Sequence, residues 1–85
     1  MKEKTQVILY TRPGCYLCEE MKVEIVKANC AELYELKEVN IESDPDLQSR
    51  YRHDIPVLLI DGVEAFRHRL RPEKFREKLL PAAQS

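Results

Sequence analysis

Several features that mark other classes of protein are missing from this 85-residue sequence. No apolar run approaches the roughly 20 residues that a membrane-spanning helix needs. The first residues do not join an apolar stretch to a small-residue cleavage site, as a secretory signal does. The 14 Lys and Arg residues nearly balance the 15 Asp and Glu residues, so no field of one sign attracts nucleic acid or an anionic membrane. We therefore expect neither partner.

Cysteine is also scarce, with three residues in the whole chain. Small secreted domains are usually held together by dense and even sets of cysteines, so this odd number indicates a protein of the reducing cytoplasm. In that compartment, two closely spaced cysteines are more often catalytic or metal-binding than structural.

The length sets the domain organisation. A chain of 85 residues has room for one modest core, so we expect a single domain over residues 1–85. We also expect this domain to be a monomer.

The residue pattern predicts alternating strands and helices. The apolar and β-branched segments predict strands, the 3.6-residue spacings predict helices, and Asp61-Gly62 is typical of a hairpin turn. Asp44 and Pro45 resemble the cap and first residue of a helix. The predicted strands are 6–11, 36–41, 55–60 and 63–68, and the predicted helices are 15–33, 44–52 and 72–80.

The apolar positions predict which helix faces are buried. In the first helix two adjacent faces carry apolar residues, which indicates burial on a broad side. These residues are Met21, Ile25 and Ala28 on one face and Val23, Val26 and Cys30 on the other. In the last helix, Phe75, Leu79 and Leu80 are expected to point inward.

Cys15 and Cys18 have only Tyr16 and Leu17 between them, at the predicted junction of strand and helix. If Cys15 caps the helix and Cys18 lies one turn in, their Cα atoms fall within the roughly 4.4–6.8 Å that a disulfide tolerates. The unpaired N–H groups at a helix start favour the thiolate form of Cys15. The spacing alone still allows a redox couple, half of a metal site or chance.

Two longer segments resemble a known family. "VILYTRPGCYLC" is similar to the opening of glutaredoxins, and "DIPVLLIDG" is similar to their proline-strand-turn segment. The chain thus resembles glutaredoxin-like proteins of the thioredoxin superfamily over nearly its whole length. This resemblance implies an α/β thioredoxin-like fold, with the order βαβ-α-ββ-α and a four-stranded mixed sheet flanked by helices. It also implies a thiol-disulfide oxidoreductase.

The expected roles follow from this reading. Cys15 is the nucleophile, and Cys18 is the resolving cysteine that attacks the mixed disulfide. By resemblance, Pro56 follows a cis peptide bond, and the backbone of Ile55 faces Cys15 as a platform for an extended substrate. Arg12 and Tyr16 complete the expected substrate-binding residues.

No metal ligands are expected, because neither His53 nor His68 stands at a spacing that completes a zinc site with the cysteine pair. Cys30 is expected to be an apolar filler, since a continuous helix would hold it far from Cys18.

The resemblance weakens at the glutathione site. Arg12, with Gln48 or Arg50, could hold the glycine carboxylate of glutathione. The usual glycine pair after the last strand is replaced by residues 67–72, which contain no glycine. We therefore expect glutathione to bind weakly or not at all, and no cofactor to be tightly bound.

The expected partners are a disulfide-bearing protein or a small thiol substrate, with a reductase or glutathione as the electron source. The alternative function is a glutathione-dependent [2Fe-2S] cluster module or an adaptor without reductase activity. The basic residues Arg67, His68, Arg69 and Arg71 are either a solvated strand end or a docking patch for an acidic partner.

Overall fold

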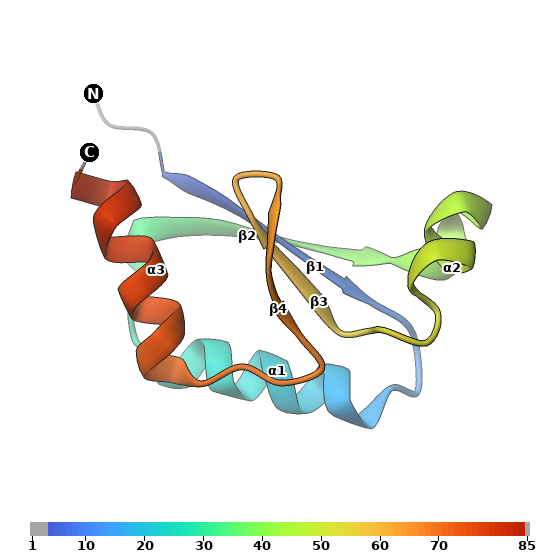
Figure 1. The fold of residues 1–85 in the computed structure, drawn as a ribbon. Coiled ribbons are helices and arrows are strands. Elements are labelled where there is room, and N and C mark those ends of the chain that lie inside the picture. Colours follow the sequence, from blue (N-terminus) through green and yellow to red (C-terminus); the bar gives the residue numbers. More distant parts are fainter. Residues whose placement is uncertain (1–3, 85) are drawn as a thin grey trace.

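The computed structural model describes residues 4–84 and has four strands and three α-helices in that range (Figure 1). Residues 1–3 and 85 of the expected domain lie outside the described residues. The elements are β1 (Thr5–Thr11), α1 (Tyr16–Lys27), β2 (Tyr34–Asn40), α2 (Pro45–Tyr51), β3 (Val57–Ile60), β4 (Val63–Arg67) and α3 (Pro72–Gln84). Two short 3₁₀ helices, η1 (Ala31–Leu33) and η2 (Ile41–Ser43), flank β2. The predicted order βαβ-α-ββ-α is confirmed.

The strands form one mixed sheet in the order β2-β1-β3-β4. β1 pairs with β2 in parallel, whereas β1–β3 and β3–β4 are antiparallel. The parallel pair requires a crossover, which α1 supplies. Along β1, Val7 and Leu9 alternate with more exposed residues and point into the core. The predicted four-stranded mixed sheet is confirmed.

Local sequence signals set several of the boundaries. The Asp44 side chain accepts a hydrogen bond from the Asp46 N–H at 2.9 Å, and Pro45 is the first residue of α2. Between β3 and β4, Asp61 and Gly62 both have positive φ, of 50° and 83°. A two-residue turn of this kind needs positive φ at both positions, and the Asp-Gly pair adopts it at low cost. The cap and the hairpin turn are therefore confirmed.

The main core lies between the sheet and two of the helices. In Figure 1, α1 runs beneath the sheet, α3 lies at one end and α2 at the other. Phe75 of α3 is fully buried and meets the rings of Tyr34 and Phe66 edge to face, at centroid distances of 5.3 and 6.4 Å. The buried residues of this core are Val7, Leu9, Met21, Ile25, Ala28, Cys30, Leu58, Leu70, Phe75 and Leu79.

The first helix is shorter and less buried than the sequence pattern indicates. α1 ends at Lys27, and Asn29 turns the chain with a left-handed φ of 53°. The Arg76 side chain donates hydrogen bonds to the free carbonyl of Ala28, through Nε at 2.9 Å. Because α1 packs through one face only, Val23 and Val26 are exposed, and the prediction of a broad buried side was wrong.

Cys30 therefore does not lie on a continuous helix with Cys18, and that part of the expectation was wrong. It follows the turn at Asn29 and is buried in the main core. Burial raises the pKa of its thiol, so the neutral form is favoured. The expected role of Cys30 as a small apolar filler fits this position.

Two neighbouring leucines of α3 offer a direct test of the packing. Both were predicted to point inward, but Leu79 is 0% exposed and Leu80 is 39% exposed. We expect Leu79→Ala to lower the free energy of unfolding by about 2–5 kcal/mol, because it leaves a cavity in the core. Leu80→Ala is the matched control and should cost less than about 1 kcal/mol. Equal losses in urea denaturation would contradict the arrangement of α3.

Candidate active site

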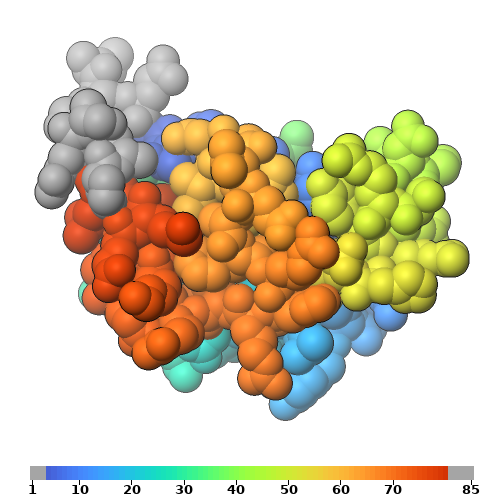
Figure 2. Space-filling view, in the orientation of Figure 1, coloured from blue at the N-terminus to red at the C-terminus, as the bar shows by residue number. Residues whose placement is uncertain are grey.

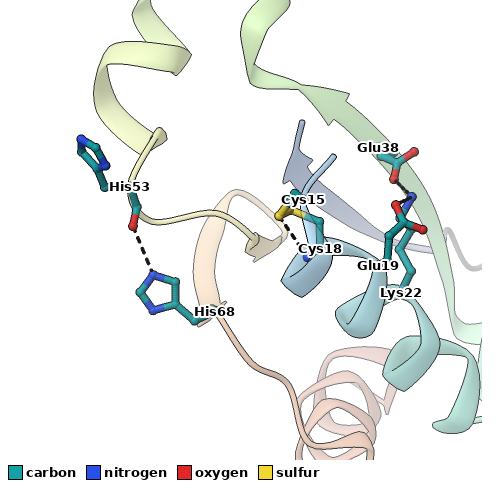
Figure 3. The surroundings of a disulfide bond; sticks show 7 residues. All are labelled: Cys15, Cys18, Glu19, Lys22, Glu38, His53 and His68. Atoms are coloured by element: carbon teal, nitrogen blue, oxygen red, sulfur yellow. Dashed lines mark hydrogen bonds and ion pairs between the residues drawn. A yellow bond between two sulfur atoms is a disulfide. The ribbon is translucent and has the colours of Figure 1, made fainter. Parts of the chain in front are cut away.

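The cysteine pair lies where the sequence predicts, at the junction of β1 and α1. Cys15 and Cys18 form a disulfide with a Cα–Cα distance of 5.2 Å, within the predicted range (Figure 3). Gly14, with a φ of 75°, turns the chain before the helix, and Cys15 occupies the N-cap position of α1. Cys15 is half-buried, whereas Cys18 is fully buried. An incoming sulfur therefore reaches Cys15 first.

The start of the helix stabilises negative charge on the first sulfur. The Cys18 N–H donates a hydrogen bond to Cys15 Sγ at 3.1 Å. This N–H has no partner within the helix, and it points toward the sulfur together with the positive end of the helix dipole. In the reduced protein the same contact favours a thiolate at Cys15.

An ion-pair chain offsets one of the acidic neighbours of the pair. Glu19 is bonded to Lys22 at 2.9 Å, and Lys22 is bonded in turn to Glu38 of β2 at 2.6 Å (Figure 3). The hydrogen bonds to Glu38 and Glu19 raise the pKa of Lys22, so it stays protonated. Lys22 thus reduces the repulsion that Glu19 would exert on a thiolate at Cys15.

A small second core surrounds Cys18, the buried cysteine of the pair. Cys18 packs with Ile41 and Ile55, and four partly buried residues close around them: Tyr10, Cys15, Leu47 and Tyr51. The rings of Tyr10 and Tyr51 lie 4.9 Å apart. This cluster keeps water from Cys18 and holds the start of α1 against α2.

A hollow of about 360 Å³ opens beside Cys15. Three of the predicted substrate-binding residues, Arg12, Tyr16 and Ile55, border it together with Cys15. The other residues around the hollow are Gly14, Leu17, Arg52 and His53. The structure thus brings Arg12, Tyr16 and Ile55 together around the predicted nucleophile.

The residues that border the hollow near α2 are not the two that the sequence analysis named there. Neither Gln48 nor Arg50 borders the hollow, and the Arg50 guanidinium lies over the Tyr51 ring instead, 5.3 Å from its centroid. Arg52 and His53, which follow α2, border the hollow instead. Sequence reasoning missed both, because a shift of one or two residues at a helix end decides which side chain faces the site.

The segment before β3 has the predicted proline geometry. The Ile55–Pro56 peptide bond is cis, as expected from the resemblance, and Pro56 is buried. The His68 N–H donates a hydrogen bond to the Pro56 carbonyl at 2.7 Å, which ties the segment to the end of β4. The Ile55 N–H donates to the Tyr51 carbonyl at 3.1 Å. A substrate strand would have to displace that bond in order to use this N–H.

Two of the three arginines at the end of β4 and just after it are held in ion pairs. Arg67 pairs with Glu64 at 2.9 Å and with Asp54 at 3.3 Å, and Arg71 pairs with Glu73 at 3.2 Å. His68 is exposed and has a left-handed φ of 70°. In Figure 2 the orange atoms between α3 and α2 belong to the β3–β4 hairpin and to the segment that follows it. A second hollow, of about 190 Å³, separates residues 68–71 from Glu20 and Glu24 of α1.

Comparison with known proteins shows the family of this chain. Residues 6–80 match the family described as Glutaredoxin-like domain (DUF836). The chain belongs to this glutaredoxin-like family. A curated glutaredoxin-like protein from Dictyostelium discoideum is 31% identical in an alignment that covers 76% of this chain and 66% of the relative. The chain therefore spans slightly less than two thirds of that relative's length.

Solved structures place the family in a wider fold class. Protein Ne2328 from Nitrosomonas europaea has a TM-score of 0.76 and 27% identity, with 93% of this chain and 95% of that chain covered. Target protein XcR50 from X. campestris has a TM-score of 0.73 and 25% identity, covering 86% and 93% of the two chains. Mitochondrial thioredoxin 3 from Saccharomyces cerevisiae, at 14% identity, shares the fold with a TM-score of 0.64 and coverage of 92% and 78%. The thioredoxin-like fold predicted for this glutaredoxin-like chain is confirmed.

Residues 4–84 of this glutaredoxin-like chain show neither a membrane-spanning helix nor a metal-binding cluster. Within residues 4–84, no helix is long and apolar enough to span a bilayer. In the same range, no three His, Cys, Asp or Glu side chains gather closely enough to hold a metal ion.

Proposed function

We propose that this glutaredoxin-like protein is a dithiol oxidoreductase that reduces disulfides through Cys15 and Cys18. The observation that carries the proposal is the asymmetry of the pair: the capping sulfur of Cys15 borders an open hollow, and its partner Cys18 is buried. Such an arrangement suits a nucleophile and a resolving thiol.

The reaction proceeds in two exchanges. The Cys15 thiolate attacks one sulfur of the substrate disulfide and forms a new S–S bond, while the substrate bond breaks and its other sulfur leaves as a thiolate that takes a proton from water. Cys18, after giving its proton to water, attacks Cys15 Sγ and expels the second substrate thiolate. The substrate gains two electrons, and the protein is left with the Cys15–Cys18 disulfide. An external thiol or dithiol reductant then restores both thiols.

Iron-sulfur cluster binding is the weaker alternative. A cluster shared between two subunits would be held by Cys15 and by glutathione, so it requires a good glutathione site. In this chain the glycine pair that would admit glutathione is replaced by residues 67–72, and Arg67 and Arg71 are held in ion pairs there. These residues do not fit such a cluster, so we propose no cluster chemistry.

The same segment bears on the source of electrons. Side chains in place of the glycine pair keep the backbone away from a γ-glutamyl group, so only the carboxylates of glutathione would find partners, at the exposed Arg12 and Arg52. We therefore propose that a dithiol or a protein reductase, and not glutathione, reduces this protein in the cytoplasm.

The two cysteines should respond differently to substitution. We expect Cys15→Ser to lower disulfide reduction to the background rate, because the nucleophile is lost. Cys18→Ser should instead accumulate a mixed disulfide with the substrate, because the resolving thiol is missing. Intact mass spectrometry after reaction with a peptide disulfide measures both outcomes. Cys30→Ser is the matched control and should turn over like the wild type. A stable adduct on Cys18 in the Cys15→Ser variant would reverse the assigned roles.

Glutathione should bind this protein only weakly. We expect reduced glutathione to bind the Cys18→Ser variant with a dissociation constant above about 1 mM, because exposed ion pairs with Arg12 and Arg52 contribute at most about 1 kcal/mol each and do not offset the cost of ordering a tripeptide. NMR titration measures this affinity, and adding Arg12→Gln and Arg52→Gln should abolish any residual shifts. Saturable shifts centred on residues 67–71 would contradict the proposal and restore a glutathione-dependent mechanism.

A further inference from the structure

The hollow beside Cys15 is bordered by two arginines, and no acidic side chain within residues 4–84 pairs with either of them. Arg12 and Arg52 both border it, and no Asp or Glu does. Within residues 4–84, neither arginine forms an ion pair, in contrast to Arg67 and Arg71. The His53 ring points away from the disulfide in Figure 3, so we do not count its charge. The two guanidinium groups are therefore free to meet a negative ligand.

The two arginines approach Cys15 from different parts of the chain. Arg12 lies in the loop between β1 and α1, and Arg52 follows α2. Tyr16, next to Cys15, is 76% exposed, and Ile55 adds an apolar side chain to the hollow. A disulfide placed on Cys15 would thus present its flanking residues to an aromatic ring, an apolar side chain and two cations.

Guanidinium groups bind carboxylates well, because their planar N–H donors match the two carboxylate oxygens. We propose that the preferred substrate is a polypeptide disulfide with Asp or Glu residues close to its cysteine. This inference rests on the proposed reductase function and names its substrate class. A polypeptide fits better than a small disulfide, since it would use the exposed Tyr16 ring and the open hollow along with both arginines.

The preference for acidic peptides has to come from the local charge of Arg12 and Arg52. The formal net charge of the chain is -1, so the molecule as a whole does not attract an acidic peptide. A local pair of cations acts over about one Debye length, roughly 10 Å at 0.1 M salt, and added salt weakens its effect.

The test compares three peptide disulfides that differ only in the residues flanking the cysteine, which are Glu, Gln or Lys. We expect the reduced wild type to react about tenfold faster with the Glu peptide than with the Lys peptide at low salt, and this ratio should shrink at 0.5 M salt. The double variant Arg12→Gln/Arg52→Gln should bring the ratio close to one. The ratio is the informative quantity, because it cancels any change in the reactivity of Cys15.

The matched control is Lys37→Gln/Arg50→Gln, which removes the same number of charges outside the hollow and should keep the wild-type ratio. Glutathione disulfide, which also carries carboxylates, is the small-molecule arm and should react no faster than the Gln peptide. If it reacts fastest, the arginines serve glutathione and the inference is overturned. Equal rates with all three peptides overturn the inference alone, and no reaction with any peptide overturns the proposed function as well.

Discussion

The hydrogen bond from the Cys18 N–H to Cys15 Sγ is the contact on which the rest of the site depends. It fixes Cys15 as the cap of α1 and directs the free end of the helix at the sulfur. It also places Cys18 one turn further on, where Ile41 and Ile55 bury it. One backbone donor thereby separates the roles of two residues of the same type.

The fold holds that helix start in place from several sides. α1 and α3 fill one core together with the sheet, and a smaller cluster under Cys18 joins α1 to the segment before Pro56. The His68 N–H bonds the Pro56 carbonyl, so the end of β4 supports the segment that faces Cys15. The ion pairs of Lys22 with Glu19 and Glu38 connect the first turn of α1 to β2. Each contact reduces the freedom of the reacting sulfur.

The sequence predicts the features of this structure that depend on local chemistry. The Asp61-Gly62 turn, the cap at Asp44 and the order of the elements follow from residue preferences. The end of α1 does not, because apolar spacing continues past Asn29, although Asn is one of the few residues that readily adopt a left-handed φ. The neighbours Leu79 and Leu80 are equally apolar, so only packing distinguishes them. Arg52 in place of Arg50 likewise depends on how α2 ends.

On the proposed mechanism, Cys15 and Cys18 form a reversible couple from which Cys30 is excluded. The most direct measurement equilibrates the protein with a small dithiol and its cyclic disulfide at a series of ratios, then denatures it and tags free thiols for mass spectrometry. Two tags should be lost together in one reversible two-electron transition, for which a tenfold change in the equilibrium constant corresponds to about 30 mV. Cys30 should stay tagged throughout. Loss of the Cys30 tag together with that of Cys15 or Cys18 would contradict this couple. So would a Cys15–Cys18 pair that never oxidises.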